Sequence, residues 1–116
     1  MVEVMVAILV TAIALIGIMA LYISGSRASS YSRHTTEASV LAEDGIERLR
    51  SQAVPTAVTI SGVNEQGVAG GLFTRTSTVV GPIGTAPTAY YDLTVAVTWS
   101  EDGRARTVKL NARRNQ

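Results

Sequence analysis

The sequence of 116 residues contains no cysteine, a single histidine and only three prolines. The lack of cysteine excludes a disulfide framework, thiolate metal sites and thiol catalysis. With one histidine there is no second base from which to build a catalytic triad, and we interpret His34, beside Arg33 on an expected helix, as a solvated surface residue. The net charge of +1 favours neither nucleic acid nor acidic ligands. We therefore expect no enzyme activity, no cofactor and no metal site.

Charge is also absent from residues 4–26, a run of 23 residues that follows Glu3 directly. Residues 4–23 are nearly all apolar, and an uncharged apolar run of this length predicts a membrane-spanning helix, which we place at residues 1–26. At 1.5 Å per residue, 20 residues cover about 30 Å, the thickness of the hydrocarbon core of a bilayer. Because a carboxylate is costly in lipid, Glu3 needs either the headgroup region or a partner.

A cleaved signal peptide is an alternative for this segment. It is disfavoured because no basic residues precede the run, which is also longer than the usual 7–15 apolar residues. The nearest cations, Arg27 and Arg33, follow the segment, and cations normally mark the cytoplasmic flank. A basic leader upstream of Met1 would give the opposite orientation, with the C-terminal domain outside.

The first residues, Met1-Val2-Glu3-Val4-Met5-Val6-Ala7-Ile8-Leu9, resemble the start of a type IV pilin or type II secretion pseudopilin. Within that family, Val-Glu-Val-Met-Val-Ala is most similar to PilV-like minor pilins. Members carry a prepilin-type N-terminal methylation motif: a basic leader ending in Gly, then Phe-Thr-Leu-aliphatic-Glu and a long apolar helix. The Gly-Phe-Thr part is not present here, so the resemblance implies a true N-terminus and processing site upstream of Met1. The resemblance is close over about the first 25 residues. The remainder is similar only in the order of its elements: helix, loop and small antiparallel sheet.

The resemblance implies that Glu3 pairs with the amino terminus of a neighbouring subunit and so sets the register of assembly. The physical reason is general, since an unpaired charge in a low-dielectric helix bundle costs several kcal/mol. The alternative is an interaction with the helix dipole, worth only about 0.3–1 kcal/mol. Small residues that allow close helix packing follow at Ala7, Thr11, Ala14 and Gly17.

Residues 27–53 predict an amphipathic continuation of the same helix, which ends before Pro55 because the residue before a proline disfavours helix. A helix from Val2 to about Gln52 would be roughly 75 Å long. Pairs at i,i+4, Arg33 with Glu37 and Asp44 with Arg48, would support its polar side. Residues expected to pack this helix against a C-terminal sheet are Tyr31, Ala38, Ala42, Leu49, Leu93, Val95, Val97, Val108 and Leu110.

Residues 54–116 predict a small globular head with an antiparallel sheet, which makes the fold class α+β and pilin-like. Strands are expected at residues 57–61 and 72–80, with a connecting loop at 82–88. The strongest signal is a hairpin at residues 90–113, in which Asp102-Gly103 predicts a two-residue turn. The turn sets the pairs Val97–Val108, Val95–Leu110, Leu93–Ala112, Asp92–Arg113, Thr98–Thr107 and Trp99–Arg106, the last a possible cation–π contact.

The last 13 residues carry five cations and no acid, which raises the alternative of DNA contact during uptake. We favour protection of an edge strand, because charges along an edge oppose aggregation and aromatic residues for base stacking are scarce. Glu101 and Asp102 are interpreted as a solvated turn.

Together these features predict a minor pilin subunit that initiates assembly of a bacterial type IV pilus and forms its tip, with roles in adhesion and twitching motility. It would span the inner membrane once and then enter the extracellular pilus (fimbrium). Expected partners are other pilins through the N-terminal helix, the leader peptidase/methylase, the assembly machinery and a tip adhesin, with no nucleic acid. The alternatives are a type II secretion pseudopilin, a non-polymerising single-pass membrane protein and a DNA-uptake pilin. The filament system and the position along the fibre stay open.

Overall fold

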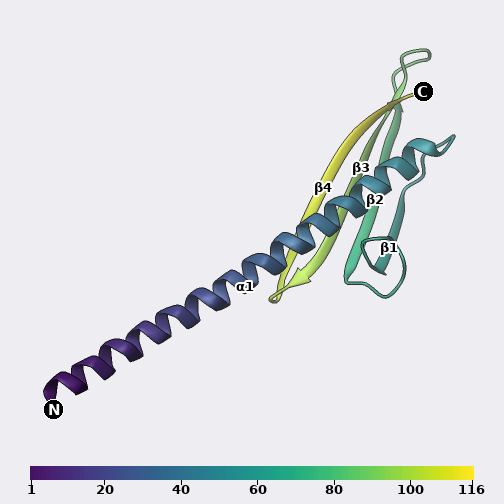
Figure 1. Ribbon diagram of the computed structural model, residues 1–116. Helices are drawn as coiled ribbons and strands as arrows, with labels where there is room; N and C mark the ends of the chain where they lie inside the picture. The colour runs from purple at the N-terminus through teal and green to yellow at the C-terminus, as the bar shows by residue number, and fades with distance from the viewer. The chain divides into compact units, whose positions relative to one another are not determined.

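The computed structural model describes residues 1–116 and has an α+β fold, as expected. One long helix is followed by four strands that form a single antiparallel sheet in the order β1-β2-β3-β4 (Figure 1). The elements are α1 (Val2–Ser51), β1 (Val58–Val63), β2 (Phe73–Ile83), β3 (Tyr90–Glu101) and β4 (Arg104–Asn115).

The chain divides into two units, Met1–Arg33 and His34–Gln116, and α1 contributes to both. The first unit is helix alone, and it holds the apolar run, which is long and apolar enough to cross a membrane. All side chains of this unit are exposed, so no other part of the chain covers its apolar surface. The second unit is the head, in which the remainder of α1 packs against the sheet.

The core of the head lies between α1 and the inner face of the sheet. From β3 it takes alternate residues, among them Leu93, Val95 and Val97, which are fully buried. Val108 and Leu110 of β4 are half-buried against them. The residues that α1 contributes lie at helical spacing: Ala38, Leu41, Ala42, Ile46 and Leu49.

Tyr31, which was expected to pack in the head, lies in the first unit and is 44% exposed. The apolar stripe predicted from the sequence includes Tyr31, but the buried part of the helix starts seven residues later, at Ala38. The reason is that an apolar stripe is buried only where another element covers it.

The hairpin has the predicted register throughout, including Val97 opposite Val108 and Trp99 opposite Arg106. Its turn is made by Asp102 and Gly103, both with positive φ (51° and 72°), the geometry that two-residue hairpins favour. Trp99 is buried and its ring meets Phe73 edge-to-face, with centroids 5.9 Å apart.

The other two strands differ in their limits from those expected. β1 runs two residues beyond residue 61, and β2 extends to Ile83, so Pro82 lies in a strand rather than in a loop. The pairing of β2 with β3 shifts register between Val80 and Ile83, and Gly81 there has a φ of 139°. A local irregularity of this kind tolerates a proline, which cannot donate a ladder hydrogen bond.

Helix α1 ends at Ser51, within one residue of the expected end. The Ser51 hydroxyl donates to the carbonyl of Arg48, and the side chain of Gln52 accepts a hydrogen bond from the Thr56 amide. These contacts satisfy polar groups at the helix end, where the chain turns toward β1.

Candidate functional site

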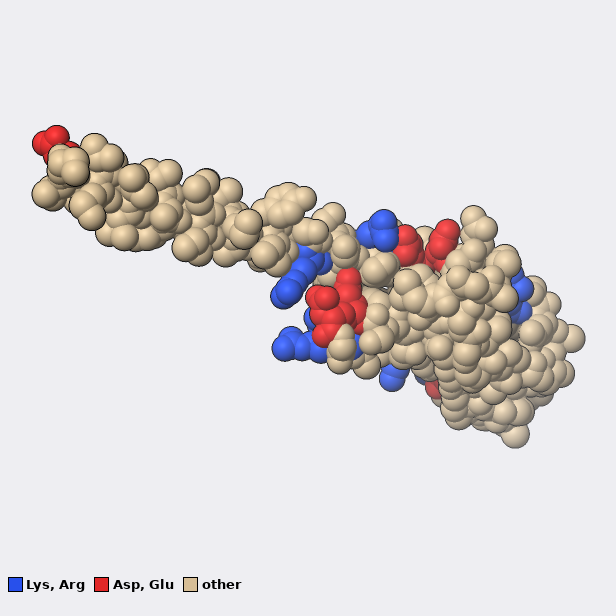
Figure 2. Space-filling view, turned by 90° about the horizontal axis from the view of Figure 1, so that it is seen from below, with Lys and Arg blue, Asp and Glu red and all other residues tan.

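The N-terminal unit presents one acidic group and then a long uncharged surface (Figure 2). Glu3 lies in the first turn of α1 and is exposed. Ala7 and Thr11 follow it at steps of four, so the three residues share one helix face. Larger apolar side chains, including Ile8 and Leu15, border this face and leave a shallow groove along it.

The groove is apolar apart from Glu3. The only other polar side chain in it, Thr11, donates its hydroxyl to the carbonyl of Ala7 at 2.7 Å. This bond satisfies the hydroxyl within the helix, which makes the group compatible with lipid or with a tightly packed neighbour. Further along the helix, Ala14 and Gly17 are small residues, and no atom outside the adjacent helix backbone lies within 4 Å of where a Cβ on Gly17 would be. The predicted packing residues therefore occupy an open apolar surface.

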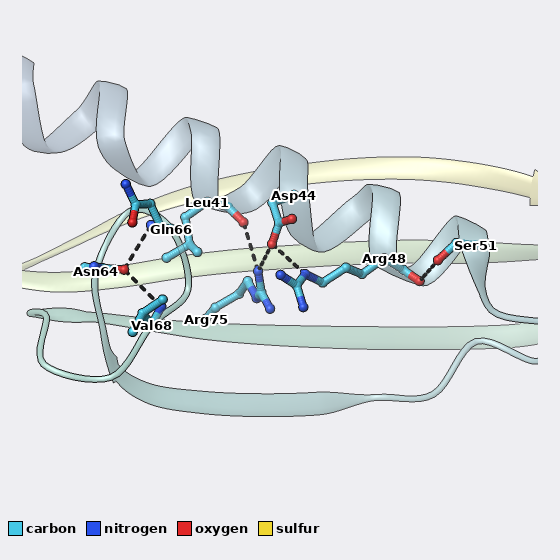
Figure 3. A network of polar contacts seen from close by, with 8 residues as sticks. All are labelled: Leu41, Asp44, Arg48, Ser51, Asn64, Gln66, Val68 and Arg75. Atoms are coloured by element: carbon cyan, nitrogen blue, oxygen red, sulfur yellow. Dashed lines mark hydrogen bonds and ion pairs between the residues drawn. The ribbon is translucent and has the colours of Figure 1, made fainter.

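A second cluster of polar residues lies in the head, where Arg75 and Arg48 share the carboxylate of Asp44 (Figure 3). Arg75 of β2 donates from Nη1 to Oδ2 of Asp44 at 2.7 Å and to the carbonyl of Leu41 at 3.4 Å. Arg48 donates from Nε to the same oxygen of Asp44, also at 2.7 Å. The predicted pair of Asp44 with Arg48 is confirmed, but the contact with Arg75 was not foreseen.

The two arginines determine the ionisation of Asp44. Burial alone would raise the pKa of this carboxyl, but the hydrogen bonds and positive charges of Arg75 and Arg48 outweigh burial and hold the pKa below its usual value. Asp44 is therefore ionised near neutral pH and stabilises the buried guanidinium of Arg75.

The sequence around Arg75 does contain a pattern that indicates its burial. In Phe73-Thr74-Arg75-Thr76-Ser77, alternate residues of a strand share one face, so Arg75 lies on the face of Phe73. Phe73, Arg75 and Ser77 are indeed all buried.

His34 was interpreted as a solvated surface residue, and this interpretation is wrong. Its side chain is only 16% exposed, and Nδ1 lies 3.2 Å from Oε1 of Glu101. The imidazole also meets the ring of Phe73 edge-on, with centroids 6.3 Å apart. Glu101, expected in a solvated turn, is 13% exposed and lies at the end of β3, so only Asp102 fits that description. The pair is a structural contact between α1 and the hairpin.

Two of the C-terminal cations are used within the head. Arg113 donates from Nε to Oδ1 of Asp92 at 3.0 Å and lies over the ring of Tyr90. The hydrogen bond to Asp92 is the main cause that raises the pKa of Arg113. Arg114 donates to the carbonyl of Gln52, at the end of the helix. Both contacts connect β4 to the rest of the head.

The head and the N-terminal helix together have a pilin-like architecture, a long apolar helix that continues into a segment packed on a small antiparallel sheet. No protein-family model matches the chain, and neither a curated protein nor a solved structure matches it.

Proposed function

We propose that this protein is a minor pilin-like subunit of a bacterial type IV pilus, which helps to initiate assembly and lies near the filament tip. The apolar segment first anchors the chain in the inner membrane and later packs with the helices of other pilins. The pilin-like architecture and the similarity of the first residues to minor pilins support this proposal.

The observation that carries the proposal is the single carboxylate at the start of an uncovered apolar helix. Glu3 lies beside a groove formed by small residues and bordered by larger apolar ones. A neighbouring helix that fills such a groove removes water from the carboxylate, and the carboxylate then needs a positive partner. An amino terminus on the neighbouring subunit supplies that charge at only one axial offset, so Glu3 selects the register.

The test is to replace Glu3 with glutamine in the chromosomal gene and to measure the subunit in membranes and in sheared filaments. Gln keeps the size of the side chain and removes its charge. We expect an unchanged amount in the membrane, because insertion depends on the apolar run, and at least about tenfold less in filaments. Glu65→Gln is the matched control, since Glu65 is an exposed acid in the head, and it should leave both amounts unchanged. Equal incorporation of the Glu3→Gln subunit would contradict the proposal.

A type II secretion pseudopilin uses the same helix chemistry, so a second experiment distinguishes the two systems. Deletion of the gene from a piliated strain should reduce surface fibres and twitching, while the set of secreted enzymes stays the same. Loss of secreted enzymes with normal fibres would instead assign the protein to secretion.

A further inference from the structure

The head contains a small cavity of about 180 Å³ between the last turns of α1 and strands β1 and β2. Its polar lining consists of Arg48, Gln52, Thr56, Arg75 and Ser77, and no carboxylate lines it. The cavity has room for a group larger than one water molecule, whose share of the liquid is about 30 Å³. Leu49, Val58 and Ile60 also line the cavity, so it combines apolar surface with two cationic side chains, Arg48 and Arg75.

The charges around this cavity do not balance. Arg48 and Arg75 both donate to the same oxygen of Asp44, so one carboxylate serves two guanidinium groups (Figure 3). Asp44 itself is outside the cavity lining. The side chain of Arg75 is 5% exposed, and a charge buried to this degree is normally matched by an opposite charge. Asp44 provides that charge for Arg75, and the second positive charge, that of the 61% exposed Arg48, has no carboxylate of its own in the cavity lining.

The hydrogen-bond donors of Arg75 are also incompletely used. A guanidinium has five N–H donors, and the two bonds of Arg75 both come from Nη1. Its Nε is buried and has no acceptor in the protein. A buried donor without an acceptor is costly, and this cost falls on a guanidinium whose residue lines the cavity.

We propose that this cavity binds a small oxyanion, a phosphate or carboxylate group, between Arg48 and Arg75. Both classes of anion have oxygen atoms spaced to accept paired bonds from a planar guanidinium. The hydroxyl group of Ser77 lies in the same lining and can donate to one of the remaining oxygens, whereas the hydroxyl of Thr56 already donates to Oε1 of Gln52 at 3.2 Å. The bound anion supplies the negative charge that the cavity lining lacks. This inference does not depend on assembly into a pilus.

The test uses the full chain in detergent micelles, labelled with ¹⁵N, and follows the arginine Nε–H signals by NMR. Inorganic phosphate and acetate are added in separate titrations, with ionic strength held constant by NaCl, and NaCl alone is the control. We expect a saturable shift of the Arg75 signal with a midpoint in the low-millimolar range. The anion that saturates at lower concentration identifies the class of ligand. A shift that is absent, or that does not saturate with either anion, would overturn the proposal.

Variants separate specific binding from general attraction. Arg48→Gln removes one of the two guanidinium groups at the site. Because Arg48 is exposed, the substitution should leave the head folded, and it should weaken binding by about tenfold or more. Arg50→Gln, on the same helix and paired only with Glu47 at the surface, is the matched control and should not change the midpoint. Ser77→Ala serves as a second variant with a smaller expected loss, because Arg75 substitutions risk unfolding of the head. Equal midpoints in Arg48→Gln and Arg50→Gln would contradict the site.

Discussion

The imidazole of His34 lies 3.2 Å from the carboxylate of Glu101, although the two residues are 67 positions apart in the sequence. The contact joins the first residue of the head, on α1, to the end of β3 at the hairpin turn. Because the ring of Phe73 flanks the imidazole, the pair is partly shielded from water. It fixes the helix against the sheet at one end of the core, as Arg114 and Gln52 do near the end of the helix.

The first prediction concerns this pair. His34→Gln and Glu101→Gln, measured singly and together, should show a coupling of about 1 kcal/mol in the free energy of unfolding. The exposed pair of Arg50 and Glu47 is the control, for which the same cycle should give about 0.5 kcal/mol or less. Chemical denaturation of the detergent-solubilised chain gives these values. Additive effects at His34 and Glu101 would show that the contact does not contribute to stability.

A second prediction follows from the lowered pKa of Asp44. At neutral pH, Asp44→Asn should destabilise the head by about 1–3 kcal/mol, because the buried guanidinium of Arg75 loses its counter-charge. The loss should be below that of a fully buried pair, since the Asp44 side chain is 39% exposed. Denaturant unfolding of both proteins measures it.

The dependence on pH has a defined sign. A carboxyl whose pKa is lower in the folded state stabilises that state above its unfolded pKa, and this contribution is lost as the pH falls through the folded value. Acidification below about pH 4 should therefore reduce the stability of the wild type more than that of Asp44→Asn. The curves of unfolding free energy against pH should converge there. A constant difference between neutral pH and pH 2 would exclude this role of Asp44.

The third prediction concerns Gly45, where α1 approaches β3 closely. A Cβ at this position would lie 2.9 Å from Cγ1 of Val95 and 3.0 Å from Cδ of Arg75. Gly45→Ala should destabilise the head by about 1–3 kcal/mol through overpacking, less the roughly 1 kcal/mol gained in helix propensity. Gly25→Ala, where no atom lies within 4 Å, is the control and should leave the Tm of the head unchanged. A higher Tm for Gly45→Ala would show that the core yields to the added methyl group.

The hairpin and the two parts of α1 could be predicted because their signals are local. Asp102-Gly103 fixes the turn, and with the period of two it fixes all the pairs of β3 and β4. The apolar run and the position of Pro55 likewise set the character and the end of the helix. These features depend on neighbouring residues alone, so no tertiary information is needed.

The contacts of His34 and Arg75 could not be predicted, because they depend on which turn of the helix meets which strand. The sequence identifies Asp44 as a partner for Arg48 four residues away but does not place Arg75, which is 31 residues distant. The burial of His34 likewise depends on Phe73 and Glu101 meeting at one place. Long-range polar contacts of this kind follow from the docking of helix on sheet.

The sheet has two unlike edges. β1 is short, with an irregularity in its pairing between Ile60 and Val63, whereas β4 pairs with β3 over all twelve residues without a bulge. β4 is therefore the longer and more regular of the two edges, the kind that needs protection against pairing with another chain. Arg104 and Lys109 are exposed on this strand, and two copies that met edge to edge would bring like charges together, which disfavours self-pairing of the sheet.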